Sequence, residues 1–452
     1  MDQKNKDLRI DMAQARSDIR EIFLAAVENA DAGRLVRNQV RLEGETLRVG
    51  NEAIDLGPFH RIHVLGIGKA AAHMALPFEE ILGDRLTGGL VIVKEGHVAP
   101  LRRIQVREAG HPIPDERGLR ATDEMVSLLK TCREDDLILF LVSGGGSALL
   151  VAPEPGLTLE DKIETTKVLL LSGASIHKIN AIRRHLSAVK GGKVVPLAYP
   201  AALVGLILSD VVGDRLEDIA SGPTIISHEA SGLGDIERIL PRYNLRGKLP
   251  KRVVAHLETI SSRAIDPPQE DHRPLKPRVK NILIGNNESL LDGARNLARE
   301  LGYTVHILSR ELQGEAREAA VLLSSLARTI REKGAPVKPP ACLLAGGETT
   351  VIVKGGGKGG RCQEFALASA VALEGENIIV LAAGSDGTDG PTDAAGAVVD
   401  GETCRRARAL SLNPHDFLLR NDSHTFFRSL GDLLITGPTR TNVMDLYAFL
   451  IP

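Results

Sequence analysis

The chain has 452 residues, of which 43% are hydrophobic and 25% charged, a composition typical of a globular protein with two domains or more. Its formal net charge is −2 and aromatic residues make up only 3%, which argues against a basic nucleic-acid surface and against base-stacking platforms. The four cysteines lack metal-binding spacing, and the N-terminus has no apolar leader. We therefore expect a cytoplasmic protein with reduced thiols.

The first half opens with a packing element and then a glycine turn. Apolar residues at helical spacing predict a helix over residues 7–30. Residues 62–75 (IHVLGIGKAAAHMA) predict a buried strand, a tight turn and a helix, in which Gly66, Gly68 and Ala71 satisfy the dinucleotide-binding pattern G-x-G-x-x-G/A. A cation at a helix start opposes the helix dipole, so we interpret Lys69 as directed at an anionic ligand rather than at solvent.

Two weaker candidates follow this turn. Glu95, at the end of the next strand, would hold a ribose hydroxyl in a nicotinamide enzyme, although we favour a plain loop charge. His111 lies in the proline-fixed turn GHPIPD and is a candidate site residue, and Asp115 in the same turn is a candidate helix cap.

The clearest element of the first half is DLILFLVSGGGSA (136–148), a doubly buried strand that ends in a glycine loop. In open α/β sheets ligands gather at the carboxyl ends of strands, and backbone N–H groups with hydroxyls suit a phosphate. The loop therefore predicts a phosphate-binding site made of Ser143, Gly144, Gly145, Gly146 and Ser147.

Basic and acidic candidates come next. Residues 172–193 form a basic helical stretch that includes Lys190, and such a stretch is either a solvated face or part of a site. A further buried strand opens onto Asp210 and Asp214, whose carboxylates are placed to hold Mg²⁺ or to accept a proton. The proline-rich segment 264–280 is a candidate linker.

The stretch 341–364 has the densest pattern. An apolar strand (ACLLA) precedes Glu348 and a second β-rich run (TTVIV), and then a glycine loop over residues 355–360 leads to Arg361 at the start of an alanine-rich helix. Free N–H groups, a helix N-terminus and two cations predict an anion site closed by a mobile loop, the alternative being a flexible surface hairpin.

A last buried strand ends in three carboxylates. Asp386, Asp389 and Asp393 are either magnesium or substrate ligands or Asx-turn residues, and both readings remain open. The chain is predicted to close with a strand over DLLITGPTRTNVMD (432–445). Several strand-end glycine loops with neighbouring cations indicate a nucleoside triphosphate and a small anionic substrate, hence phosphoryl transfer with Lys69 and Arg361 as the cations.

Taken in order, nine motifs resemble the class II glycerate kinases over most of the chain. They are GIGKAA (66–71), GHPIPD (110–115), SGGGSA (143–148), IRRHLSAVKGG (182–192), SDVVGD (209–214), ASGPT (220–224), GGETTV (346–351), GGRCQE (359–364) and GTDGPTDAAGA (387–397). The resemblance implies ATP- and Mg²⁺-dependent phosphorylation of D-glycerate, most often at the C2 hydroxyl, in a cleft between an N-terminal kinase domain and a C-terminal MOFRL domain.

The resemblance assigns roles to three residues and marks two departures. Lys69 matches the family lysine at the transferred phosphate, Arg361 the arginine of the second glycine loop, and Asp210 the aspartate after its strand. Cys362 stands where an asparagine is expected, which puts substrate preference in doubt only if its side chain touches substrate. Arg440 stands where a glycine is more usual.

We therefore predict two α/β domains, a Rossmann-like one with a mostly parallel sheet (1–260) and one with a mixed sheet (261–452, with the MOFRL region at about 340–450). The predicted partners are ATP and D-glycerate, with a homo-oligomer possible and neither nucleic acid nor membrane. Two alternatives remain: an NAD(P)-dependent hydroxypyruvate reductase and a non-catalytic metabolite-binding module. Besides the three residues above, the predicted site includes Gly66, Gly68, Ser143–Ser147, His111, Lys190, Glu348, Asp386 and Asp389, with Asp210 and Asp214 as metal ligands.

Overall fold

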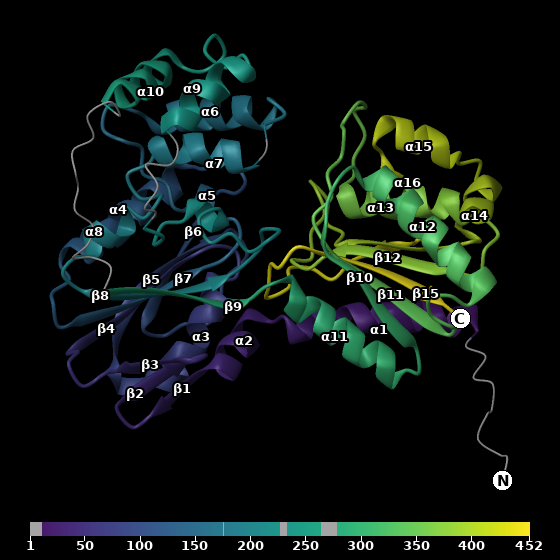
Figure 1. The fold of residues 1–452 in the computed structure, drawn as a ribbon, viewed down its shortest axis with the longest axis horizontal. Coiled ribbons are helices and arrows are strands. Elements are labelled where there is room, and N and C mark those ends of the chain that lie inside the picture. Colours follow the sequence, from purple (N-terminus) through teal and green to yellow (C-terminus); the bar gives the residue numbers. More distant parts are fainter. Residues whose placement is uncertain (1–10, 175, 227–232, 264–277) are drawn as a thin grey trace. The chain divides into compact units, whose positions relative to one another are not determined.

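A computed structural model describes residues 11–174, 176–226, 233–263 and 278–452 (Figure 1). Contacts divide the chain into two compact units. The first unit contains the described residues of 32–210 and 214–284, and the second those of 1–31, 211–213 and 285–452. These limits differ from the division at residue 260, because the strand Val279–Gly285 joins the sheet of the first unit and the N-terminal helix packs with the C-terminal half of the chain. Most of the predicted linker, 264–277, lies outside the described residues.

The first unit alternates strands and helices, as its sequence predicts. Its strands are β1 (Val40–Glu43), β2 (Thr46–Val49), β3 (Glu52–Asp55), β4 (Arg61–Ile67), β5 (Leu86–Lys94), β6 (Ile104–Ala109), β7 (Asp136–Val142), β8 (Ala202–Leu208) and β9 (Val279–Gly285). Its α-helices are α2 (Ala32–Gln39), α3 (Ala71–Leu82), α4 (Glu116–Lys130), α5 (Gly146–Leu149), α6 (Leu159–Leu170), α7 (Ile176–His185), α8 (Val194–Ala198), α9 (Leu233–Arg242) and α10 (Lys251–Arg263).

The main sheet of the first unit has the order β6-β5-β4-β7-β8-β9, and the strands from β6 to β8 pair in parallel. The chain runs outward from β4 to β5 and β6, and then returns to β7 on the other side of β4. This reversal is a topological switch point, where open α/β sheets place ligands beyond the carboxyl ends of the strands. Every residue of β7 is buried, as expected for a central strand with helices on both faces.

Figure 1 shows how helices complete the first unit. Helix α3 packs against β4 and β5, while α4 packs against β6 and α8. A separate apolar cluster joins α6, α7, α9 and α10, with Leu169, Ile182, Leu240 and Leu257 at its centre. The small antiparallel sheet β1-β2-β3 lies beside α3, which β1 contacts.

The second unit also alternates strands and helices. Its strands are β10 (Thr304–Leu312), β11 (Ala341–Gly347), β12 (Ile379–Gly384), β13 (Gly396–Asp400), β14 (Leu433–Leu434) and β15 (Asp445–Ile451). Its helices are α1 (Met12–Asn29), α11 (Asn287–Glu300), α12 (Ala316–Lys333), α13 (Arg361–Ala372), α14 (Thr403–Ala409), α15 (Pro414–Arg420) and α16 (Ser423–Leu430). None of the described helices is both long and apolar enough to cross a membrane.

The sheet of the second unit is mixed and has the order β10-β11-β15-β12-β13-β14. Strands β10 and β11 are parallel, whereas β15 pairs antiparallel with both β11 and β12. In Figure 1, α1 and α11 lie on one face and α12 and α13 on the other. The core between α13 and the sheet contains Phe365, whose ring contacts those of Tyr447 and Phe449. The prediction of two α/β folds, one mostly parallel and one mixed, is confirmed.

Two strand predictions in the second unit are wrong. The run TTVIV forms no strand: Thr350 makes a single bridge to Glu315, after which the chain leaves the sheet. In the predicted closing strand 432–445, only Leu433–Leu434 and Asp445 are strand residues. The last strand is β15, whose seven residues are all buried at the centre of the sheet. The helix predicted over 7–30 is confirmed as α1, with residues 7–10 outside the described part.

Candidate active site

The loops after β4 and β7 meet at the switch point of the first unit. The N–H of Ser143 donates to the carbonyl of Ile67 at 3.0 Å, and the N–H of Lys69 donates to the carbonyl of Gly144 at 2.9 Å. Gly68 has φ +118°, and a Cβ there would lie 2.2 Å from Ser143 Oγ. A glycine is therefore required at this contact. The structure thus brings together the two glycine loops that the sequence places apart.

In a dinucleotide-binding turn, backbone N–H groups at the start of the helix bind phosphate, but here they bond other protein groups. At the start of α3, the N–H of Lys69 is bonded to Gly144, and the N–H of Ala70 donates to Ser143 Oγ at 3.0 Å. Gly66 lies inside the sheet, where a Cβ would come 3.0 Å from Leu141 Cβ. Gly66 and Gly68 thus serve the packing of the two loops, and the N-terminus of α3 does not present the donors that a pyrophosphate needs.

Gly144 and Gly145 have open backbone donors instead. Within the residues that the structure describes, their N–H groups make no hydrogen bond. Gly145 has φ +82°, and a Cβ on it would lie 3.1 Å from His111 Nε2 and 3.3 Å from Lys69 Cγ. His111 and Lys69 therefore flank the loop from two sides. Free N–H groups between an imidazole and an ammonium form a cradle for an anion.

A buried network that the sequence did not reveal supports the far end of this loop. Ser147 Oγ and Ser221 Oγ are 2.8 Å apart, and Ser221 donates to Asn180 Oδ1 at 3.2 Å. Asn180 reaches Asp218, whose side chain is 2% exposed and which also bonds His177 at 2.5 Å. Asp218 is therefore a buried member of this network rather than a surface residue.

The turn that carries Ser221 is conformationally strained. Ala220, Ser221 and Gly222 have φ values of +52°, +63° and +59°. Non-glycine residues with φ above zero are costly, and they persist where the surroundings fix them, often at functional sites. Here the strained turn brings Ala220 Cβ against Gly146, where a Cβ on the glycine would be only 2.8 Å away. The motif ASGPT therefore packs against residues 143–147, the loop that the sequence predicts to bind phosphate (the phosphate loop).

Lys190 lies inside the first unit rather than on a solvated face. It is 2% exposed, and its Nζ donates to the carbonyl of Leu150 at 2.9 Å, just after α5. Burial, with Lys162 and Arg183 nearby, holds the pKa of Lys190 well below its ordinary value. Nearby Lys162 is also buried, and its pKa is lowered to about 7. Lys190 thus supports the backbone that follows the phosphate loop.

Asp210 and Asp214 follow β8, the strand next to β7. Both residues are half-buried, and Asp214 has φ +51°. Their carboxylates thus belong to the edge of the sheet at which the phosphate loop begins. Oxygen ligands at that edge fit a magnesium ion that is held by one or two carboxylates and by substrate phosphates.

In the second unit, Arg361 is held by two carboxylates at the carboxyl ends of β11 and β12. Its Nε and Nη2 donate to the two oxygens of Asp445 at 2.6 and 2.9 Å, and its Nη1 donates to Glu348 at 2.5 Å. Asp445 is 1% exposed, and Tyr447 donates to it at 3.0 Å. Burial lowers the pKa of Arg361, but Asp445 and Glu348 outweigh that effect and raise it well above its ordinary value.

Asp445 was missed by sequence reasoning, although the topology gives it a central place. It opens β15 in register with Gly347 at the end of β11 and Gly384 at the end of β12. Two glycines beside it leave room for the guanidinium of Arg361. The sequence did place this carboxylate at the end of a predicted strand. Its position became clear only with β15, the strand that Asp445 begins.

The start of α13 is occupied by Asp389. Its carboxylate accepts the N–H groups of Cys362 and Gln363 at 3.1 and 2.8 Å and the side chain of Gln363 at 3.0 Å. Burial raises the pKa of Asp389 to about 6. Asp386 accepts the N–H of Thr388 at 3.0 Å, as in an Asx turn. Of the open readings for these residues, the structure favours capping and turn roles.

The glycine loop before Arg361 is anchored rather than free. Asn421 Oδ1 accepts the N–H groups of Lys354 and Gly355 at 2.8 and 2.9 Å, and Asp422 accepts that of Lys358 at 3.0 Å. Glu364 in turn accepts from Asn421 at 3.0 Å. Many of the N–H groups that the sequence offered for an anion are therefore used within the protein. The cation at this edge is Arg361, whose guanidinium is itself paired with Asp445 and Glu348.

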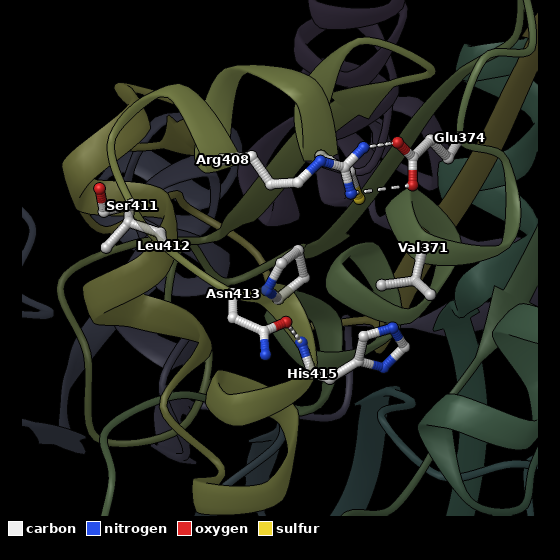
Figure 2. Close-up of a pocket in the computed structure, with 9 residues that line it drawn as sticks. Val371, Glu374, Arg408, Ser411, Leu412, Asn413 and His415 are labelled. Atoms are coloured by element: carbon white, nitrogen blue, oxygen red, sulfur yellow. Dashed lines mark hydrogen bonds and ion pairs between the residues drawn. The ribbon is translucent and has the colours of Figure 1, made fainter.

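A separate small pocket of about 230 Å³ lies in the second unit (Figure 2). The pair Arg408 and Glu374 borders it, and His415 and Asn413 line it. The buried thiol of Cys404 also lines it. None of the predicted site residues is part of this lining, so the pocket and the candidate active site are distinct.

Comparison with known proteins agrees with these features. Residues 18–258 match the family described as a domain of unknown function (DUF4147), and residues 341–445 match the MOFRL family. The chain is 40% identical to a glycerate 2-kinase of Pyrococcus horikoshii over 95% of its length and 96% of the relative's. It is 44% identical to a D-glycerate 2-kinase of Thermotoga maritima over 86% and 91%. The chain belongs to the glycerate 2-kinase family.

The solved structure of a glycerate kinase from Thermotoga maritima has the same fold. It superposes with a TM-score of 0.81 at 39% identity, over 97% of this chain and all of that chain. A protein of Agrobacterium vitis named putative hydroxypyruvate reductase is 39% identical over 97% of this chain and 94% of its own. The resemblance to class II glycerate kinases is therefore confirmed, whereas the name of the last relative keeps the reductase alternative in view.

The two departures from the glycerate kinase pattern lie in different environments. Cys362 is a fully buried residue of the first turn of α13, and its N–H bonds Asp389. Its thiol interacts with Asp445 and lies near Arg361, so its side chain borders the carboxylate that holds the arginine. Arg440 is exposed in the loop before β15.

Proposed function

We propose that this protein transfers the γ-phosphoryl group of ATP to the C2 hydroxyl of D-glycerate and releases ADP and 2-phosphoglycerate. The phosphate loop at the switch point of the first unit carries the proposal, because its open N–H groups and flanking cation form a phosphate cradle. Membership of the glycerate 2-kinase family supports the same substrate.

The phosphate loop and Lys69 act on the nucleotide in this proposal. The N–H groups of Gly144 and Gly145 donate to phosphate oxygens, and the ammonium of Lys69 neutralises the charge that develops on the transferring phosphoryl group. His111, which also contacts the Gly145 region, donates to a phosphate or to the glycerate carboxylate. Lys190 positions the loop through its bond to Leu150.

Arg361 supplies the second cation. Asp445 holds its Nε and Nη2, and this bidentate pair fixes the plane of the guanidinium. Its Nη1 faces Glu348, whose side chain is 41% exposed and can move into solvent. We propose that an anionic group of substrate or nucleotide replaces Glu348 at Nη1, so that Glu348 acts as a substrate-responsive partner. Asp386 and Asp389 then maintain the loops around the arginine.

Magnesium enters the proposal through Asp210 and Asp214. Bound Mg²⁺ would neutralise phosphate charge and align the β- and γ-phosphates. The oxygen-only donor set after β8 fits this ion, as described above. Asp210 is also a candidate base in this proposal, since a carboxylate at the same edge can accept the proton of the C2 hydroxyl.

The reductase alternative finds less support in the structure. The donors at the start of α3 are bonded to Gly144 and Ser143, so the pyrophosphate position of a nicotinamide cofactor is occupied. Glu95, the candidate for the ribose hydroxyls, pairs with Arg117 at 3.1 Å. Only a measurement of turnover distinguishes the kinase from a non-catalytic binding module.

The deciding experiment measures ADP release by the purified protein with ATP, Mg²⁺ and D-glycerate. L-Glycerate and hydroxypyruvate with NADPH serve as parallel substrates. Enolase acts on the 2-phosphate and not on the 3-phosphate, so coupling the product to enolase identifies the position. ADP formed only with D-glycerate, followed by the enolase signal, supports the proposal. NADPH consumption without ADP would replace the kinase with the reductase. The absence of both signals would indicate the binding module.

Matched lysine variants test the phosphate cradle. Lys69→Met removes the cation beside the loop and should lower turnover by about 100-fold or more. Lys130→Met removes an exposed lysine from the last turn of α4 and should leave turnover unchanged. Equal turnover in the two variants would remove Lys69 from the mechanism.

A further inference from the structure

A second cluster of ligand-type side chains lies at the opposite edge of the first unit's sheet. His63 is near the start of β4, Asp136 opens β7, and Cys132 belongs to the turn between α4 and β7. One ligand atom from each of the three lies within 4.8 Å of the others. In the parallel pairing of β4 with β7, Arg61 lies opposite Asp136, so these residues gather at the amino-terminal edge of both strands.

The carboxylate of this cluster is fixed in place. The side chain of Asp136 is fully buried, and its two oxygens accept from Arg61 Nε at 2.7 Å and Nη2 at 2.5 Å. The N–H of Arg133 also donates to it at 2.6 Å. Hydrogen bonds of this kind orient metal-binding carboxylates in proteins, and a carboxylate oxygen retains a lone pair for a metal.

The other two groups lack good partners. His63 Nδ1 is buried and makes no hydrogen bond to any residue that the structure describes. Cys132 is 7% exposed, and its thiol donates a weak hydrogen bond to the carbonyl of Leu128 at 3.5 Å. An unsatisfied buried nitrogen costs about 1–3 kcal/mol, and native proteins seldom leave one without an explanation. An ion between these groups would satisfy the nitrogen.

We propose that His63, Cys132 and Asp136 bind one divalent transition-metal ion such as Zn²⁺, with water as the fourth ligand. Imidazole nitrogen, thiolate sulfur and carboxylate oxygen form a donor set that zinc accepts and that magnesium does not favour. On binding, the S–H proton of Cys132 leaves to solvent and a metal–sulfur bond forms. The thiolate and the carboxylate then place two negative charges beside the ion, and Arg61 stays paired with the carboxylate.

The site would act on the fold rather than on the reaction. It joins the turn after α4 to two neighbouring strands at the edge away from the phosphate loop. A metal that binds the folded state only would stabilise it by mass action. Such transition-metal ions would therefore raise the melting temperature of the first unit without being required for phosphoryl transfer.

Cobalt(II) is the probe, because a cobalt–thiolate bond gives a near-ultraviolet charge-transfer absorption that oxygen and nitrogen ligands alone do not give. We expect the chelator-treated full-length protein, without nucleotide, to show this band with one equivalent of Co²⁺. Cys132→Ser should abolish it. Cys404→Ser is the matched control: Cys404 donates to the carbonyl of Ala370 at 3.3 Å, a bond that a hydroxyl can also make. No band in the parent protein, or a band that survives in Cys132→Ser, would overturn the proposal.

Zinc affinity provides a second and independent measurement. Competition with a chromophoric chelator should give one Zn²⁺ per chain, and His63→Gln should weaken binding by at least about 100-fold. Unchanged kinase turnover of the metal-free variants under Mg²⁺ shows that they fold. Stoichiometry near zero in the parent protein, or equal affinity in His63→Gln, would mean that the three residues are not metal ligands.

Discussion

The pair of Arg361 and Asp445 yields the sharpest prediction. Asp445→Asn is nearly isosteric, but it removes the negative charge, and its amide group turns one acceptor of the bidentate pair into a donor. The guanidinium of Arg361 then keeps one hydrogen bond to this residue and its exposed bond to Glu348. The direction of its plane is no longer fixed.

Two terms set the magnitude. A lost hydrogen bond to a charged group costs about 1.5–3 kcal/mol, and removal of one partner of a buried ion pair costs about 3–5 kcal/mol. Asp445 is 1% exposed, whereas the side chain of Arg361 is 34% exposed and keeps some contact with solvent. We therefore expect the free energy of unfolding to fall by about 3 kcal/mol. Misplacement of a catalytic group by about 1 Å costs about 100-fold in rate, and we expect a loss of that order in kcat.

The assay compares kcat and KM at a temperature at which each variant is folded. Asp432→Asn is the matched control, because Asp432 is also a buried carboxylate of the second unit that pairs with two arginines, Arg16 and Arg406. It should lose stability to a similar extent and keep its kcat. A folded Asp445→Asn protein with the kcat of the parent would refute the positioning role of Asp445.

Three further predictions concern the loops. Gly68→Ala should unfold or inactivate the first unit, because its Cβ would lie 2.2 Å from Ser143 Oγ. Gly44→Ala is the control: a Cβ there has nothing within 4 Å, and a denaturant titration should show a free energy of unfolding lowered by about 1 kcal/mol. The pKa of Asp389 is raised from 3.8 to about 6, so the ionised form is disfavoured in the folded state and stability falls as pH rises through 4 to 6. Relative to Asp389→Asn, the parent should lose up to about 3 kcal/mol over that window, and parallel pH curves would contradict the assignment. Lys190→Met should keep its KM for D-glycerate and lose about 1 kcal/mol of stability, and a large rise in KM would restore Lys190 as a substrate ligand.

The strand-end motifs of the first unit could be predicted from the sequence because each depends only on residues that are close together in the chain. Buried apolar runs predicted β4 and β7, and the glycines after them predicted the loops that meet at the switch point. The position of Arg361 at the start of α13 was likewise set by local pattern, since a glycine run followed by alanine-rich sequence marks a helix start. The order of nine motifs was enough to indicate the family.

Partners of these residues were decided only by the tertiary structure. Asp389 looked like a ligand and is a cap of α13. Two of the N–H groups predicted to be free before Arg361, those of Gly355 and Lys358, are used by Asn421 and Asp422. Asp445 was overlooked because its importance depends on β15 entering the centre of the sheet between β11 and β12. A sequence shows which donors and acceptors a chain carries. Which of them the fold consumes internally, and which remain for a ligand, depends on pairings between residues distant in the chain, and these exist only once the sheet has formed.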